Sequence, residues 1–306
     1  MNIDQIQRVL VIGAGTMGQQ IALQCAMHGY AVNLYDIEPA MLETATAQIK
    51  MYADHLLAQQ RLTEAEARAT LARITTTANP QEAAQADLLS ESVPEDPELK
   101  GRVLAQFNEL CPAHTIFTTN TSFLLPSMFA KATGRPARFA ALHFHQVVWD
   151  SNVVDIMPHP GTAPETVEVL QTFARRIGQI PIILEKENYG YVFNAMLSAL
   201  NGAALALAAN NVTSVEQIDR AWMGVMKMPI GPFGIMDLIG LKTVWDITEY
   251  WAKTLDDAQL QANADFVKRY VDQGHLGIKS GQGFYTYPDP AYQQPDFLEG
   301  LSQQKK

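Results

Sequence analysis

Cysteine is scarce in this sequence, and so is positive charge. Two cysteines, Cys25 and Cys111, are too few for a disulfide framework. Lys and Arg number 22 against 32 Asp and Glu, and the resulting formal net charge of −10 argues against a nucleic-acid partner. The seven histidines show none of the spacings that hold a metal ion, so no metal is expected.

Long apolar runs are missing as well. The longest one, residues 195–209, is interrupted by Ser198 and Asn201 and is too short to cross a bilayer. The first residues lack the basic start and the apolar stretch of a signal peptide. We therefore expect a cytoplasmic protein with no membrane partner.

The most informative feature that is present is a glycine-rich turn near the N-terminus. Four apolar residues, 9–12, lead into Gly13-Ala14-Gly15-Thr16-Met17-Gly18, and a helical apolar pattern follows. Gly13 permits a tight turn, Gly15 lets the backbone approach a pyrophosphate, and Gly18 lets the helix pack closely on the strand. The free N–H groups at the start of the helix then bind the pyrophosphate. The residues expected at the dinucleotide are Gly13, Gly15, Thr16, Met17 and Gly18.

A second apolar run, 31–35, ends in an acid, Asp36, eighteen residues after Gly18. A carboxylate there accepts hydrogen bonds from the ribose 2′-hydroxyl of NAD, whereas it repels the 2′-phosphate of NADP. The next residue, Ile37, offers no cation to a phosphate. A lone glycine motif can be an ordinary loop, but a strand, a helix, a second strand and an acid in register favour NAD as the cofactor.

Strand and helix signals alternate over the first part of the chain. Short apolar or β-branched runs predict strands, and helical spacing fills the segments between them. The predicted strands are residues 9–12, 31–36, 74–77, 86–93, 116–120, 139–144, 152–157 and 181–184. This alternation predicts an α/β, Rossmann-type domain over residues 1–186, with a doubly wound, mostly parallel sheet.

From residue 187 to 306 the strand signals stop, which predicts an all-helical domain for substrate binding and dimerisation. Its first helix, 193–209, is apolar on nearly every face, as a helix buried on all sides would be. Such a helix in so small a domain favours packing against a second copy, so we expect a homodimer. The proline-rich tail from Tyr287 is expected to be extended and poorly ordered.

Two polar residues interrupt the apolar strands late in the first domain. His143 lies near the end of the strand 139–144, where ligands bind in such sheets, and Asp155 lies in the next strand among apolar neighbours. A carboxylate in an apolar strand needs a partner, and an imidazolium supplies one. Beside a nicotinamide, such a pair provides a general base for deprotonating an alcohol. The structural alternative is a satisfied core histidine with a turn-forming aspartate.

Two further positions are candidates for a functional role. Ser122 ends the polar run Thr119-Asn120-Thr121-Ser122 behind another predicted strand, and its alternative is a simple helix N-cap. Asn194 opens the apolar helix of the second domain, where a buried amide must be paired, and its alternative is structural capping.

These points meet in one resemblance. The sequence resembles the 3-hydroxyacyl-CoA dehydrogenase family, including its short-chain 3-hydroxybutyryl-CoA members, from Gly13 to Tyr285. Besides the glycine turn, the segments that carry the resemblance are Glu95 with Lys100, Asn120-Thr121-Ser122, His143-Phe144, Gly190-Tyr191-Val192-Phe193-Asn194, Gly231-Pro232-Phe233-Gly234 and Lys279-Ser280-Gly281-Gln282-Gly283-Phe284-Tyr285.

The resemblance implies a role for each candidate. His143 is similar to the catalytic base that takes the 3-hydroxyl proton, and Asp155 stands where a glutamate orients that base. Ser122 and Asn194 match residues that hydrogen-bond the reacting oxygen or the thioester carbonyl. Three residues match positions near the nicotinamide and its ribose: Glu95, Lys100 and Lys279.

The sequence also departs from the family. The usual His-Phe-Phe-Asn-Pro around the base is His143-Phe144-His145-Gln146-Val147 here, so Gln146 stands for an asparagine at the cofactor. Well-known members grip coenzyme A with a serine and a lysine on the helix after the ribose-binding acid, and Tyr52 and Gln59 replace them here. The nearest cations, and the candidates for binding the coenzyme A phosphates, are Lys50 and Arg61.

Residues 121–127 and 158–164 are similar instead to the gulonate 3-dehydrogenase and lambda-crystallin branch, which oxidises free 3-hydroxy acids. We expect an NAD-dependent dehydrogenase that interconverts a short-chain L-3-hydroxyacyl-CoA and its 3-oxo form. One alternative is a dehydrogenase of a free 3-hydroxy acid of the gulonate or carnitine type. Another is a catalytically retired NAD-binding protein.

Overall fold

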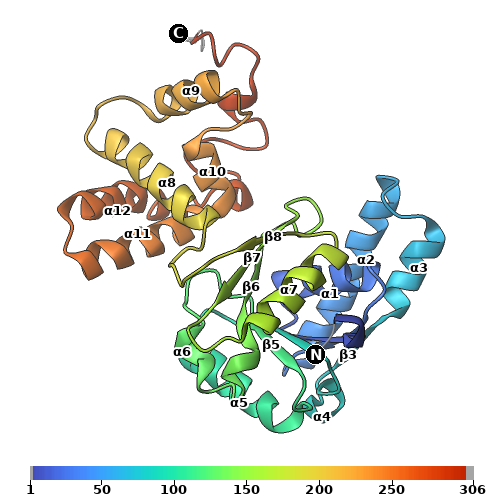
Figure 1. Ribbon diagram of the computed structural model, residues 1–306. Helices are drawn as coiled ribbons and strands as arrows, with labels where there is room; N and C mark the ends of the chain where they lie inside the picture. The colour runs from blue at the N-terminus through green and yellow to red at the C-terminus, as the bar shows by residue number, and fades with distance from the viewer. Residues whose placement is uncertain (1–2, 301–306) are drawn as a thin grey trace. The chain divides into compact units, whose positions relative to one another are not determined.

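The computed structural model describes residues 3–300 (Figure 1). Two compact units divide between Asn194 and Ala195, eight residues after the boundary expected from the sequence. The first unit is built from strands and helices, and the second is helical. Within residues 3–300, no helix combines the length and the apolar character needed to cross a membrane.

An eight-stranded sheet forms the centre of the first unit, in the order β3-β2-β1-β4-β5-β6-β7-β8. All neighbouring strands in it are parallel except β6 and β7. The α/β, mostly parallel fold predicted from the alternating signals is therefore confirmed. The strands are β1 Arg8–Ile12, β2 Ala31–Tyr35, β3 Ile74–Thr77, β4 Leu88–Glu91, β5 Ile116–Thr119, β6 Phe139–Phe144, β7 Val153–Pro158 and β8 Ile180–Ile183.

Helices cover both faces of this sheet (Figure 1). One apolar core joins the sheet to α1, α2 and α7, and a second core joins the opposite face to α4, α5 and α6. Strands buried on both faces are mostly apolar, as in the fully buried β6, where His143 is the one polar residue. The helices of this unit are α1 Thr16–Met27, α2 Pro39–Ala58, α3 Glu64–Ala72, α4 Pro80–Ala83, α5 Pro97–Leu110, α6 Ser127–Ala130 and α7 Pro164–Arg176, with 3₁₀ turns η1 Ile3–Gln5 and η2 Pro136–Arg138.

The second unit is made of helices and 3₁₀ turns. They are α8 Phe193–Ala209, which begins at the end of the first unit, α9 Val215–Met226, α10 Pro232–Ile239, α11 Leu241–Leu255, α12 Ala258–Val271, η3 Ile278–Ser280 and η4 Ala291–Gln293. The prediction that α8 is buried on all sides is wrong for the single chain. Its buried residues are Ala204, Leu205 and Ala208, whereas Met196 is 62% exposed, because the other helices cover only one side of it.

Two buried carboxylates organise the second unit. Asp219 on α9 accepts hydrogen bonds from the N–H groups of Phe233 and Gly234 and from the Tyr285 hydroxyl, at 2.9–3.0 Å. Asp237 on α10 accepts from the N–H groups of Phe284 and Tyr285, at 2.8 and 2.9 Å. The glycine-rich segments 231–234 and 279–285 thus surround these two carboxylates. Neither aspartate was predicted from the sequence to have a role.

From Tyr287 to residue 300 the tail is folded onto the helical unit, so the expectation of an extended, poorly ordered tail is wrong there. Residues 301–306 lie outside the described part of the chain. The Tyr287 hydroxyl donates to Asp237 (2.9 Å), and the side chains of Tyr292 and Phe297 are buried in the core of the helical unit. Arg220 on α9 donates from Nε to the Phe297 carbonyl oxygen (2.5 Å). Aromatic side chains therefore anchor this segment to the helical unit.

Candidate active site

The carboxyl ends of the parallel strands bring the predicted site residues to one edge of the sheet. The glycine turn follows β1, Asp36 follows β2, and Ser122 comes three residues after the end of β5. His143 is the fifth of the six residues of β6. Because β7 runs antiparallel to β6, Asp155 lies directly opposite His143 in the register.

The glycine turn fits a dinucleotide. A Cβ on Gly18 would lie 1.8 Å from the Gly13 carbonyl oxygen, so only glycine lets α1 pack this closely on β1. Gly13 has φ +98°, a conformation that other residues rarely adopt. A Cβ on Gly15 would meet nothing within 4 Å, which leaves the backbone open to a ligand. The first N–H groups of α1 have no partner within the helix and point toward this space.

Asp36 has a structural task in addition to its expected contact with ribose. Its Oδ2 accepts from the N–H of Ala14 (2.8 Å) and its Oδ1 from the N–H of Glu38 (3.0 Å). A carboxylate offers about four lone-pair sites, so acceptor capacity remains for ribose hydroxyls. The next side chain, Ile37, is 74% exposed and brings no positive charge.

His143 and Asp155 form the pair that the sequence suggested, and a third residue joins them. His143 Nδ1 lies 3.1 Å from Asp155 Oδ2, and His145 Nε2 lies 3.2 Å from the same oxygen. His143 and Asp155 are almost fully buried, and His145 is 14% exposed. In the sequence, His145 stands out only as a departure from the family pattern.

Burial and hydrogen bonding set the charge of this pair. Burial lowers the pKa of His143, and the hydrogen bond with Asp155 only partly offsets this effect, so the pKa stays below its usual value. Burial would raise the pKa of Asp155, but the hydrogen bonds from His143 and His145 outweigh it and leave the pKa below its usual value. At neutral pH the aspartate is therefore ionised and His143 is neutral.

The same three residues form a cluster of potential metal-binding groups in the described part of the chain. In the arrangement seen here, both ring nitrogens that face Asp155 are engaged in hydrogen bonds with it. Because an ionised carboxylate only accepts hydrogen bonds, each of these nitrogens carries a hydrogen rather than a free lone pair. The cluster is thus arranged for proton chemistry.

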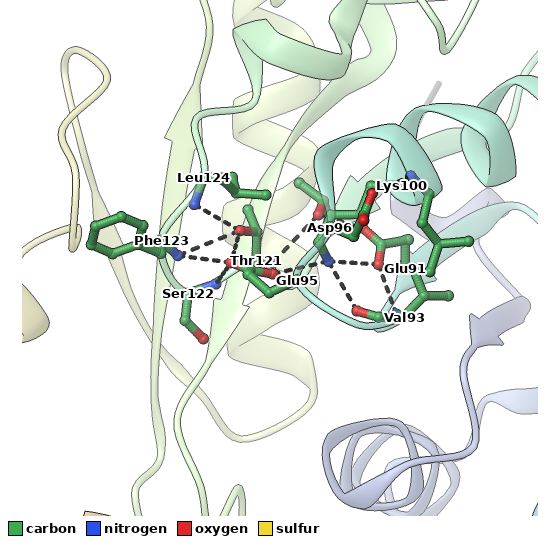
Figure 2. Close-up of polar contacts among 11 residues, drawn as sticks. Glu91, Val93, Glu95, Asp96, Lys100, Thr121, Ser122, Phe123 and Leu124 are labelled. Atoms are coloured by element: carbon green, nitrogen blue, oxygen red, sulfur yellow. Dashed lines mark hydrogen bonds and ion pairs between the residues drawn. The ribbon is translucent and has the colours of Figure 1, made fainter. Parts of the chain in front are cut away.

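Glu95 holds the turn that carries Ser122, as Figure 2 shows. Its Oε1 accepts from the N–H groups of Ser122 and Phe123, both at 3.0 Å, and from the Thr121 hydroxyl. Thr121 in turn accepts from the N–H of Leu124 (2.9 Å), so the run forms a turn. It does not cap a helix, because the next helix, α6, begins only at Ser127. The Ser122 side chain is exposed.

Lys100 lies beside Glu95 (Figure 2). It is 1% exposed, and its ammonium contacts Glu91 Oε1 at 2.8 Å, Glu95 Oε2 at 3.2 Å and the Val93 carbonyl oxygen at 3.1 Å. These acceptors use its three N–H donors. The ammonium therefore supports Glu95 from inside the protein.

Family models match nearly the whole chain. Residues 8–188 match the model for the 3-hydroxyacyl-CoA dehydrogenase NAD binding domain, and residues 190–287 match the model for the C-terminal domain of the same enzymes. The chain belongs to the 3-hydroxyacyl-CoA dehydrogenase family. As a member, it is an NAD-dependent oxidoreductase, so the expected enzyme class, fold and cofactor are confirmed.

The relatives include enzymes of two kinds. A probable 3-hydroxybutyryl-CoA dehydrogenase of Bacillus subtilis is 30% identical over 93% of this chain and 99% of its own length. The crystal structure of (S)-3-hydroxybutyryl-CoA dehydrogenase from Ralstonia eutropha is 29% identical, with a TM-score of 0.85 over 93% of this chain and 100% of that one. A solved diketoreductase that acts on dicarbonyl compounds is 38% identical, with a TM-score of 0.85 over 92% of this chain and 99% of that one.

The two cations expected to bind coenzyme A are both paired within the enzyme. Lys50 Nζ lies 2.6 Å from Asp54 in an exposed ion pair on α2. Arg61 forms an ion pair with Asp150 and donates from Nη2 to the Trp149 carbonyl oxygen (2.7 Å). Arg61 thus ties the end of α2 to the loop between β6 and β7.

Three further residues were predicted for the site: Gln146, Asn194 and Lys279. Gln146 is exposed in the loop after β6. Asn194 is partly buried and follows Phe193, whose ring contacts His145 with centroids 5.5 Å apart. Lys279 is exposed on η3 of the second unit.

Proposed function

We propose that this enzyme interconverts a short-chain L-3-hydroxyacyl-CoA and the corresponding 3-oxoacyl-CoA. The observation that carries the proposal is the buried His143–Asp155 pair at the carboxyl edge of a sheet whose first turn fits NAD. The chain length follows the relatives named for 3-hydroxybutyryl-CoA.

Each residue has a defined task in this reaction. The hydrogen on His143 Nδ1 is held by Asp155, which leaves Nε2 as the acceptor for the 3-hydroxyl proton. Asp155 stabilises the imidazolium that forms, and Ser122 and Asn194 bind the reacting oxygen or the thioester carbonyl. NAD, when bound, accepts the hydride from C3.

The residues around the cofactor follow from the same proposal. The glycine turn with Thr16 and Met17 binds the pyrophosphate, and Asp36 binds the ribose. Lys100 acts through Glu95, because its ammonium is enclosed by acceptors of the protein. Two further side chains are proposed to contact the nicotinamide half: Gln146 and Lys279.

Replacing His143 tests the proposal. His143→Ala should lower kcat for acetoacetyl-CoA reduction by about 10²–10⁴-fold, the usual contribution of a general acid or base. NADH affinity, measured by the change in its fluorescence, should stay nearly unchanged, because the cofactor is held by other residues. The matched control is His114→Ala, since His114 pairs with Asp87 and not with the His143–Asp155 pair. Wild-type turnover in the His143→Ala variant would disprove the assignment.

A second candidate is the reduction of a free 3-oxo acid or another dicarbonyl compound. It is favoured by the 38% identity to a diketoreductase and by the internal pairing of Lys50 and Arg61. Comparing kcat/KM for acetoacetyl-CoA, acetoacetate and an uncharged 3-oxo ester decides between the two candidates. Preference for either small substrate would support the second.

We also propose that two copies associate through the helical unit and that the enzyme works in the cytoplasm. Support for the dimer comes from the exposed apolar side chains of α8, including Met196 at 62% and Phe193 at 49%. Sedimentation of the enzyme tests the dimer, and Met196→Lys should weaken it if this face is covered. The retained dyad speaks against a retired, purely NAD-binding role.

A further inference from the structure

His145 contacts both members of the catalytic pair. Its Nε2 faces Asp155 Oδ2 at 3.2 Å, the oxygen that also faces His143. Its ring meets the edge of the His143 ring, with centroids 4.7 Å apart and planes at 70°. On its other side it contacts Phe193 at 5.5 Å. Such a position gives His145 direct influence on both members of the pair.

The arrangement defines where the hydrogens lie. Asp155 is ionised and can only accept, so His143 Nδ1 and His145 Nε2 both donate to it. Two donors on one oxygen divide its negative charge between two rings. His143 therefore receives less stabilisation for its protonated form than it would from a carboxylate of its own.

The other titratable groups around His143 are few. Tyr191 stacks on its ring with centroids 4.6 Å apart, and burial raises the pKa of this tyrosine well above its usual value, so it stays neutral. Glu95, between β4 and α5, raises the pKa of His143, but its effect is smaller than the effects of Asp155 and His145. The proximity of His145 lowers the pKa of His143, in the same direction as burial.

We propose that His145 is a positioning residue for the proton transfer. The hydrogen bond that it donates to Asp155, in addition to the one from His143, weakens the hold of this carboxylate on protonated His143. A weaker hold makes protonated His143 a better proton donor to the 3-oxo group during reduction. The inference rests on the proposed role of His143. The family pattern has phenylalanine at the position of His145, and a phenylalanine side chain has no donor for this hydrogen bond.

Two variants separate the hydrogen bond from simple ring packing. His145→Phe keeps an aromatic ring between His143 and Phe193 but removes the donor. His145→Gln loses the ring but keeps an N–H donor at a reach similar to Nε2. A packing role would make the phenylalanine variant resemble the wild type, whereas the proposed role makes the glutamine variant resemble it.

The test measures the pKa of His143 by an NMR titration of the full-length protein without substrate. The His143 signal is assigned by its loss in His143→Ala. In His145→Phe the His143 pKa should rise by about half to one unit. In His145→Gln it should rise by clearly less. No rise in the phenylalanine variant, or equal rises in both, would overturn the proposal.

A kinetic measurement then links the titration to the reaction. In His145→Phe, the acid limb of the pH profile of kcat/KM for 3-hydroxybutyryl-CoA oxidation should move to higher pH. The shift should equal the rise in the His143 pKa measured by NMR. If the acid limb stays in place while the NMR titration moves, His143 is not the catalytic base and the proposed function fails. The NMR result alone decides whether His145 shares Asp155 with His143.

Discussion

Removing the buried ammonium of Lys100 tests whether this residue supports the site from beneath or binds the cofactor. Lys100→Met keeps most of the volume and deletes the charge. Glu91, 0% exposed, then loses its ion-pair partner at 2.8 Å and keeps only the Val93 N–H and the Thr119 hydroxyl. Breaking a buried pair by removing one partner costs about 3–5 kcal/mol.

Hydrogen exchange resolved by peptide measures this cost for each unit separately. The slowest amides of β4 and β5 should exchange roughly 100-fold to several thousand-fold faster in Lys100→Met, since each 1.36 kcal/mol is a factor of ten. The helical unit serves as the internal control. Adding Glu91→Gln should recover much of the loss, because no unpaired charge then remains buried.

The matched control lies on the same helix. Arg102→Met removes an exposed charge that pairs with Glu98 and should leave exchange unchanged. NADH affinity of Lys100→Met, measured on the folded fraction, should change only slightly. If NADH binding collapsed while exchange stayed at the wild-type level, Lys100 would be a direct cofactor ligand and our assignment would be wrong.

Three other predictions concern the cofactor, the pH dependence and the substrate. Asp36→Ser with Ile37→Arg should raise the ratio of kcat/KM for NADPH over NADH by about tenfold or more, since one charged hydrogen bond contributes about 1.5–3 kcal/mol; an unchanged ratio would contradict the role of Asp36. Burial raises the pKa of Asp219 from 3.8 to about 6. Its contribution to the unfolding free energy is therefore complete below pH 4 and falls by about 3 kcal/mol as the pH rises to 6. Thermal unfolding of the wild type and of Asp219→Asn across this pH range should show that difference, and parallel stability curves for the two proteins would refute it. Arg61→Ala should raise the KM for acetoacetyl-CoA but not for a truncated acetoacetyl thioester if Arg61 binds phosphate, while Asp150→Asn should not raise it; equal effects of both variants on both substrates would mean that the ion pair only fixes the loop.

Local patterns were enough to predict the sheet. Each strand of the first unit is a short apolar or β-branched run, and each is followed by a turn or helix signal that depends only on neighbouring residues. The edge where the site lies also follows from the pattern, because the carboxyl ends of parallel strands share one edge. The pairing of His143 with Asp155 could be anticipated because a carboxylate in an apolar strand needs a partner. The antiparallel step that places them opposite each other was not predicted.

Contacts between distant residues were harder to anticipate. Nothing in the sequence around Lys100 shows that Glu91 and Glu95 enclose its ammonium, because helix α5 must first pack on the sheet. The internal partner of Arg61 comes from a loop 89 residues later. His145 was visible as an unusual residue, but its direction toward Asp155 depends on how the chain leaves β6.

The order in which this chain is synthesised adds a consequence to the anchored tail. The sheet of the first unit is complete once β8, Ile180–Ile183, has left the ribosome. The helical core, in contrast, includes Tyr285, Tyr292 and Phe297, so it can close only when almost all of its helices have already emerged. During that interval a finished α/β unit carries apolar helices without their final partners. Chaperones that bind nascent chains should therefore contact the helical unit, and a ribosome stall shortly before Tyr285 should leave the first unit folded and the second open to proteases.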